Sequence, residues 1–201
     1  MNRASVFASV AFAGIALLGA SLAGATTVQK FTMKELTAKS DAIVMAKVVD
    51  QSSRQDATNK EIYTYITISV TESVKGAKGE KSITIRQLGG TVGNLISVVP
   101  GMPTFKTGEE VVLFLSPKDQ AGYPWVMGLQ QGKYSIVTDD AGLKHVRNDL
   151  DGLRMLSPNG SVNESKVSSD QPLGAFLDGI KTDLNIDGKA KVDPSNTTPI
   201  R

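Results

Sequence analysis

The fold is decided by the stretch 62–71, which reads Ile62-Tyr63-Thr64-Tyr65-Ile66-Thr67-Ile68-Ser69-Val70-Thr71. Its apolar residues fall on one side of an extended chain (Ile62, Ile66, Ile68 and Val70), and the other side carries Tyr63, Tyr65, Thr67, Ser69 and Thr71. A period of two indicates a half-buried strand, and one polar face indicates an antiparallel sheet. The chain is therefore expected to be mainly β.

Further strands are expected on both sides of this stretch. Residues 41–49 are apolar on both faces and residues 111–115 are continuously apolar, which predicts two strands in the middle of the structure. Ile83 and Ile85 extend the core between polar neighbours. Segments 125–129 and 133–138 are interpreted as a hairpin that turns near residues 130–132, and a further strand at 143–147 follows the turn 139–142.

Two helices are expected to flank the sheet. Thr32 and Glu35 have the spacing of a capping box, which predicts a short helix over 33–39. Near the other end, apolar residues recur at helical spacing and predict an amphipathic helix over 170–186; they are Leu173, Phe176, Leu177, Ile180 and Leu184. The fold class predicted is an OB-like antiparallel barrel or a β-sandwich with an N-terminal and a C-terminal helix.

The first 25 residues have the pattern of a secretory signal peptide. A weakly basic start precedes an apolar run, and Ala23-Gly24-Ala25 has the small-x-small pattern of a cleavage site. Cleavage would make Thr26 the first residue of a protein of the periplasm or the exterior, with no stable membrane anchor. The remaining chain is divided into a β domain at 26–156, a polar linker loop at 157–169, the C-terminal helix and a disordered tail at 187–201.

Composition excludes several classes of protein. The chain has no cysteine and a single histidine, His145. Disulfides, a thiol nucleophile and metal sites that need several imidazoles within one chain are therefore excluded. Basic and acidic residues are interleaved between positions 47 and 81, so no nucleic-acid partner is expected.

Four short patterns resemble the netrin-type module, the OB-fold barrel shared with tissue inhibitors of metalloproteinases. They are the run 40–49, the strand that closes on Val74-Lys75-Gly76, the turn before 81–85, and the run 107–115. The resemblance covers residues 41–116 and implies an exported binding module. In the inhibitor branch, it implies a protein that blocks a zinc protease through an N-terminal cysteine held by disulfides. Here the terminus would be Thr26, a candidate binding residue because its free α-amino group could ligate metal when neutral. Nothing covalent would anchor it, so a frayed end without function is the favoured interpretation.

Two groups of residues are candidates for binding a ligand. Gly89, Gly90 and Gly93 belong to a glycine-rich run that is either a backbone nest for an anion or a flexible hairpin; the run lacks both nucleotide-binding spacings, which favours the hairpin. Tyr123 and Trp125, together with Tyr63 and Tyr65, are a candidate aromatic face for carbohydrate or peptide, with ordinary strand packing as the favoured alternative.

One stretch is a candidate metal site. Asp183, Asn185 and Asp187 match the first half of a calcium-binding EF-hand loop, but the second half of that loop is missing. A polar helix end is the favoured alternative, and calcium is the one cofactor considered.

The sequence contains no serine-hydrolase motif. Its best interpretation is an exported, non-enzymatic binding module with a protein partner, in its sharpest form an inhibitor of an exported protease. One alternative is an exported hydrolase whose site is assembled from distant carboxylates or from His145 with Asp139 or Asp149. A calcium-responsive surface protein is the other.

Overall fold

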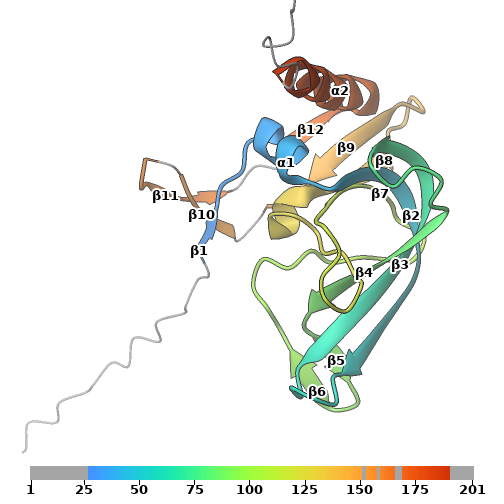
Figure 1. The fold of residues 1–201 in the computed structure, drawn as a ribbon, viewed down its shortest axis with the longest axis vertical. Helices are drawn as coiled ribbons and strands as arrows, with labels where there is room; N and C mark the ends of the chain where they lie inside the picture. The colour runs from blue at the N-terminus through green and yellow to red at the C-terminus, as the bar shows by residue number, and fades with distance from the viewer. Residues whose placement is uncertain (1–26, 151–152, 158, 166–168, 191–201) are drawn as a thin grey trace, which may run out of the picture.

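Figure 1 shows the computed structural model, which describes residues 27–150, 153–157, 159–165 and 169–190. The expected signal peptide, Thr26 and residues 191–201 of the expected tail lie outside the described residues. None of the helices in the described part of the chain is long and apolar enough to cross a membrane.

A seven-stranded antiparallel sheet forms the body of the protein, which confirms the mainly β prediction. In spatial order its strands are β12 (Ser169–Pro172), β9 (Lys144–Asn148), β8 (Lys133–Thr138), β7 (Glu110–Leu115), β2 (Ala42–Gln55), β3 (Ile62–Lys75) and β4 (Ser82–Leu88). The two segments that are apolar on both faces, β2 and β7, lie side by side in its interior, as expected. Within the described residues, the edge strands β4 and β12 do not pair with each other, so the strands do not close into a barrel.

One face of the sheet curls around an inner core. The buried side chains there come mainly from the four strands β7, β2, β3 and β4: they include Val48, Ile66, Ile85, Leu113 and Phe105. The connecting segment 124–127 completes the curl, because it bonds to a strand on each side. Pro124 O accepts from Arg86 N of β4 at 3.0 Å, while Trp125 O accepts from Ser116 N at 3.0 Å and Met127 N donates to Phe114 O of β7 at 2.8 Å.

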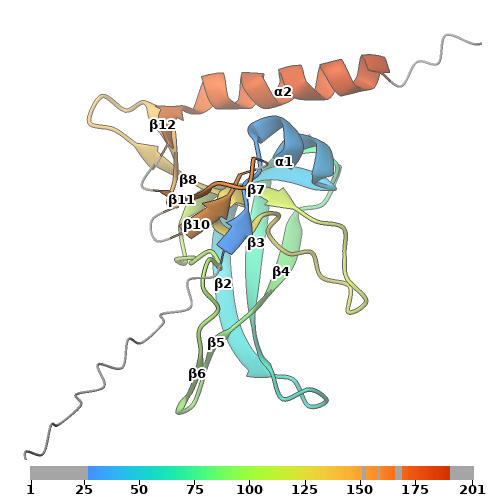
Figure 2. The same ribbon diagram turned by 90° about the vertical axis from the view of Figure 1, so that its left-hand side faces the viewer.

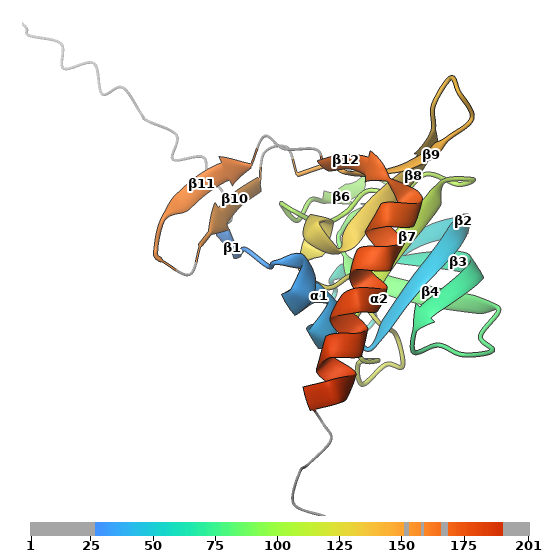
Figure 3. The ribbon, with the colours of Figure 1, turned by 90° about the horizontal axis from the view of Figure 1, so that it is seen from above.

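The two helices cover the other face of the sheet (Figure 2). Helix α1 (Met33–Lys39) has the predicted capping box: Glu35 N donates to Thr32 Oγ1 at 3.2 Å, and Thr32 N donates to Glu35 Oε2 at 2.8 Å. Helix α2 (Leu173–Ala190) buries the predicted apolar stripe, with Phe176 packed against the rings of Phe114 and Tyr134. Seen from above, α2 lies across the sheet (Figure 3).

Two sequence predictions about the connections are wrong. Residues 125–132 are not half of a hairpin: 129–132 form the 3-10 helix η1 (Leu129–Gly132), and β8 pairs instead with β7 and β9. The buried side chain of Gln131 explains this arrangement, since its amide accepts from Phe31 N at 2.8 Å and donates to Gln29 O at 2.9 Å. These contacts tie the turn to the N-terminal segment.

The expected linker 157–169 also contains strands. Strand β11 (Val162–Ser165) pairs with β10 (Leu153–Leu156), which in turn pairs in parallel with β1 (Thr27–Gln29). Strand β12 begins at Ser169, so α2 begins at Leu173 rather than at 170 and continues to Ala190. The polar composition of this segment predicted a loop. Short edge strands form there all the same, because backbone pairing holds them and they need few apolar side chains.

Candidate ligand-binding site

Three of the candidate binding residues lie around two neighbouring cavities beside β4. We call the first the seam pocket, because it lies where β4 meets the segment that follows Asp119. Its volume is about 350 Å³, and its walls are Tyr63, Arg86, Gln87, Leu88, Met102, Pro103, Asp119, Trp125, Val126 and Leu129. Most of these side chains are apolar, so the seam pocket fits an apolar group.

A fixed charge pair forms one wall of the seam pocket. Arg86 Nη2 lies 2.6 Å from Asp119 Oδ2, and the guanidinium stacks 4.6 Å from the centre of the Tyr63 ring. Burial lowers the pKa of Arg86, but the hydrogen bond and charge of Asp119 outweigh it and raise this pKa above its ordinary value. Burial raises the pKa of Asp119, but the backbone N–H of Tyr123 and the Arg86 guanidinium hold this pKa below its ordinary value. Both groups therefore stay charged at neutral pH.

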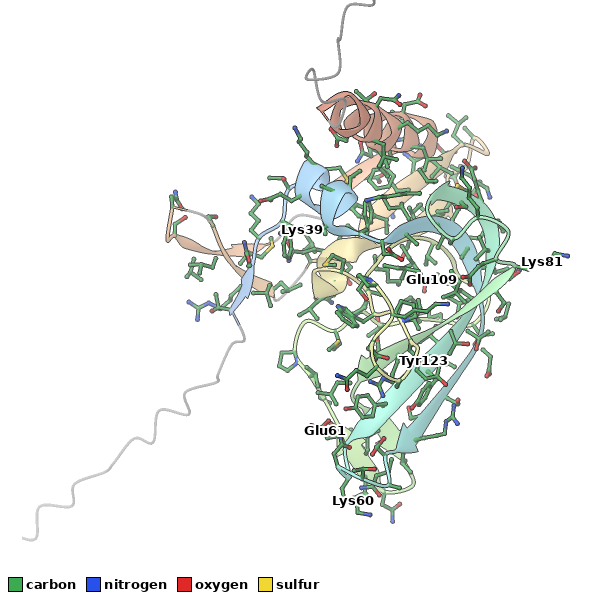
Figure 4. All side chains as sticks on the ribbon, viewed as in Figure 1. Lys39, Lys60, Glu61, Lys81, Glu109 and Tyr123 are labelled. Carbon is green, nitrogen blue, oxygen red and sulfur yellow. The ribbon has the colours of Figure 1, made fainter. Side chains whose placement is uncertain are left out.

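Tyr123 packs behind this wall and does not line the seam pocket. Its ring meets Tyr65 edge-on at 5.2 Å between centroids and lies 6.0 Å from the Arg86 guanidinium. Figure 4 labels Tyr123 on the loop beside β4. The predicted aromatic face is therefore divided: Tyr63 and Trp125 line the cavity, and Tyr65 and Tyr123 pack beside it.

Trp125 is the exposed aromatic residue of the seam pocket. Its side chain is large and apolar, yet 43% of the residue remains accessible to solvent. The backbone beneath it is fixed, because Trp125 N donates to Ser116 Oγ at 3.0 Å and Trp125 O accepts from Ser116 N. A fixed, half-exposed indole is typical of the residues that dominate binding surfaces.

The second cavity, which we call the hydroxyl pocket, shares a wall with the first. Its volume is about 550 Å³, and it shares Gln87, Leu88, Met102 and Pro103 with the seam pocket. Its polar lining includes Ser53, Thr64, Gly89 and Gly90; Thr64 Oγ1 donates to Gly89 O at 2.7 Å and lies 2.9 Å from Ser53 Oγ. Gln87 Nε2 donates to Pro103 O at 3.1 Å, while Gln87 Oε1 is buried without a hydrogen-bond partner among the described residues.

An apolar hairpin extends from this cavity. Strands β5 (Gly90–Val92) and β6 (Leu95–Ser97) pair across a turn at Gly93 and Asn94, and Figure 1 places them at the lower end of the molecule. The glycine-rich run is therefore a hairpin, the alternative that its spacing favoured. Three apolar side chains on or next to β6 are exposed: Leu95 is 54%, Ile96 73% and Val98 80% accessible.

A third cavity, of about 380 Å³, collects several polar side chains. Glu109 Oε1 lies 2.7 Å from Lys133 Nζ and accepts from Ser135 Oγ at 2.5 Å, and Asp149 also lines this cavity. Burial raises the pKa of Glu109, but the hydrogen bonds and charge of its partners outweigh it and hold this pKa below its ordinary value. A carboxylate kept ionised in this way is unsuited to the role of general acid in a hydrolase.

The Glu109 ion pair has a testable effect on stability. Its side chains are 17% and 13% exposed, so Glu109→Gln is expected to lower the free energy of unfolding by about 2 kcal/mol at pH 7. Because the folded pKa lies below the unfolded one, this stabilisation is present at neutral pH and is lost as pH falls through the folded pKa. The difference from wild type in urea denaturation should therefore shrink at pH 3.

The matched control is the neighbouring carboxylate. Glu110 pairs with Lys144 at 2.5 Å, but both side chains are about half exposed, so Glu110→Gln is expected to cost less than about 0.5 kcal/mol. Equal losses for the two variants would contradict this explanation.

Of the residues of the hydrolase hypothesis, Asp149 lines the third cavity, whereas His145 and Asp139 line none of the three cavities described above. His145 lies between two carboxylates, with Nε2 3.2 Å from Asp139 and Nδ1 3.2 Å from Asp170. The structure thus brings His145 to Asp139, as one sequence hypothesis required, but within a surface charge cluster that also contains Arg147.

The structure does not form the loop that the calcium hypothesis requires. Asp183, Asn185 and Asp187 all lie within α2, which runs on to Ala190 where an EF-hand loop would have to turn away from the helix. Among the residues that the structure describes, no cluster of three or more His, Asp or Glu side chains is placed to hold a metal ion.

Sequence reasoning missed several residues that line the seam pocket, some of which also line the hydroxyl pocket. Arg86, Gln87 and Asp119 come from the edge strand and from a loop, and Met102 and Pro103 come from the connection between β6 and β7. One available signal was the turn 119–122, in which Asp119 Oδ1 accepts from Ala121 N at 2.9 Å, since aspartate and glycine at this spacing favour a turn.

Neither a scan against protein-family models nor a search of curated proteins finds a match to this chain.

Proposed function

We propose that this protein is an exported, non-enzymatic binding module that holds a protein partner at the seam pocket and the β5–β6 hairpin. The single observation that carries the proposal is the half-exposed Trp125 beside an apolar pocket with a fixed arginine. Tryptophan, tyrosine and arginine are the residue types that most often dominate the energetics of protein interfaces.

The exposed apolar side chains around the pockets support a partner larger than a small molecule. Val98 lines the hydroxyl pocket and continues to Ile96 on the hairpin, while Met102 and Pro103 connect that pocket to the seam pocket. Apolar side chains so exposed are costly in water, and a patch of them marks an interaction site. A protein partner can cover the hairpin and both pockets together.

In its finer form, the proposal includes the OB-like fold and the resemblance to the netrin-type module. The 124–127 segment bonds to both β4 and β7 and so completes a curl of four strands around the inner core, which is compatible with an OB-like barrel. In that form the partner is an exported protease. The contact surface proposed here differs from that of the inhibitor branch, because it does not depend on the N-terminus.

Position-specific cross-linking tests the proposal, since the chain has no cysteine of its own. Val98→Cys and Leu143→Cys are each labelled with a photoactivatable cross-linker and illuminated with the envelope and culture-supernatant proteins of the source organism. Leu143 is the matched control, because it is 62% exposed but lies in the β8–β9 turn. A protein adduct at position 98 that is absent at 143 is expected; equal adducts, or none at 98, would overturn the proposal.

A further inference from the structure

The turn that joins β10 to β11 places a side-chain amide next to a backbone nitrogen that can react with it. Asn159 is followed by Gly160, and this is the only Asn–Gly pair in the sequence. Both residues are exposed, and a Cβ at Gly160 would meet no atom within 4 Å, so the chain beside Asn159 is open to water. Ser157 N donates to Ser161 O at 2.9 Å and closes the turn.

Ser161 contacts the side-chain carbonyl of Asn159 with two donors. Its Oγ donates to Asn159 Oδ1 at 2.7 Å, and its backbone N donates to the same atom at 3.1 Å. When a nucleophile attacks Asn159 Cγ, negative charge develops on Oδ1, and donors that already point at this oxygen stabilise that charge. The turn therefore polarises the amide toward attack.

We infer that Asn159 is a site of spontaneous deamidation, a modification that adds a negative charge to the turn between β10 and β11. The backbone N of Gly160 forms a bond to Asn159 Cγ, and the bond from Cγ to Nδ2 breaks. Nδ2 leaves as ammonia and carries away the proton that Gly160 N loses. Water then adds to either carbonyl of the resulting succinimide and leaves an aspartyl or an isoaspartyl residue, with no change of oxidation state.

One contact of Gly160 opposes this reaction. Gly160 N donates to Ser157 O at 2.9 Å, and this bond must open before the nitrogen can attack. The bond lies in an exposed turn, where a backbone hydrogen bond is readily exchanged for one to water. Glycine favours the attack, because it has no side chain to crowd the close approach of its nitrogen to Cγ. Asn159 is therefore expected to react faster than other exposed asparagines.

Conversion is expected to loosen the strand pair next to the turn. An isoaspartyl residue carries the chain through its side-chain carbon, which adds one atom to the backbone between Ser157 and Ser161. The hydrogen bond between these two residues closes the turn, and the next pair of the ladder is formed by the partly exposed Leu156 and Val162. The backbone amides of β11 are therefore expected to lose protection from hydrogen exchange as conversion proceeds.

Peptide mapping by mass spectrometry measures the reaction, because replacement of the amide NH₂ by OH increases the mass. The purified protein is incubated at mildly alkaline pH and sampled over time. Asn94 is the internal control: it is exposed in the turn between β5 and β6, but Leu95 follows it, and no hydrogen bond to its side chain is found among the described residues. Asn159 is expected to convert at least about tenfold faster than Asn94.

Two variants separate the geometry of the turn from the Asn–Gly sequence itself. Ser161→Ala loses the hydroxyl donor and is expected to convert at least about threefold more slowly, whereas Ser161→Thr keeps that donor and is expected to stay within about twofold of wild type. Conversion of Asn159 no faster than that of Asn94 would overturn the site, and equal rates for Ser161→Ala and wild type would overturn the role of Ser161. Cross-linking at position 98 decides the proposed function separately.

Discussion

Replacing Trp125 by alanine is expected to weaken binding of the cross-linked partner about 100-fold and to change the free energy of unfolding by less than about 1 kcal/mol. The asymmetry follows from the position of the side chain. Trp125 is 43% exposed and lines the seam pocket, whereas its backbone contacts to Ser116 survive the substitution. The ring is therefore expected to contribute much more to the complex than to the fold. Affinity is measured by calorimetry and stability by urea denaturation.

Two further variants make this prediction specific. Trp125→Phe keeps an aromatic ring and is expected to retain binding within about tenfold of wild type. Leu143→Ala removes an exposed apolar side chain from another part of the surface and is expected to have no effect on binding. An affinity loss below threefold for Trp125→Ala, or an equal loss for Leu143→Ala, would place the contact surface elsewhere.

Gly90→Ala is expected to lower the free energy of unfolding by about 3 kcal/mol. The backbone at Gly90 has φ of +135°, a region that is essentially restricted to glycine. A Cβ there would also lie closer than 3.0 Å to Thr64 Oγ1 and Ser53 Oγ, which line the hydroxyl pocket. Strain and overpacking therefore act together, and binding is expected to fall with stability because the β5–β6 hairpin is displaced.

Gly93→Ala is the matched control in the same hairpin. Gly93 has φ of +57°, but a Cβ on it would meet no atom within 4 Å. Its substitution is expected to cost only the left-handed backbone strain, about 1 kcal/mol. Thermal or urea denaturation of the two variants separates the effects, and a loss at Gly93 as large as at Gly90 would show that packing against Ser53 and Thr64 is unimportant.

The sequence predicted the sheet interior and the helices well, because their signals are local. Alternation in β3, the continuous apolar run in β7 and the Thr32–Glu35 capping box each depend on residues near one another in the chain. Which segments pair with each other depends instead on residues far apart in the chain. The hairpin prediction for 125–138 was wrong because Gln131 bonds to Gln29 and Phe31, about a hundred residues away, and no local pattern shows such contacts.

The candidate site was only partly predictable for the same reason. Gly89, Gly90 and Trp125 were recognised as unusual residues, but their relation depends on the loop 98–106 and on the segment after Asp119. Arg86 is an ordinary polar position in a strand pattern until Asp119, 33 residues later, pairs with it. The residues of such a site come together when distant loops pack against each other, and the pattern of a single sequence does not show which loops do so.

Fluorescence of Trp125 tests the central claim most directly, because the chain contains one tryptophan and it lies in the seam pocket. The protein is titrated with the partner identified by cross-linking, in a form that lacks tryptophan. Saturable burial of the indole is expected, with emission shifted to shorter wavelength and protection from quenching by acrylamide. Binding detected by calorimetry with an unchanged emission spectrum and unchanged quenching would contradict the assignment of the seam pocket as the contact site.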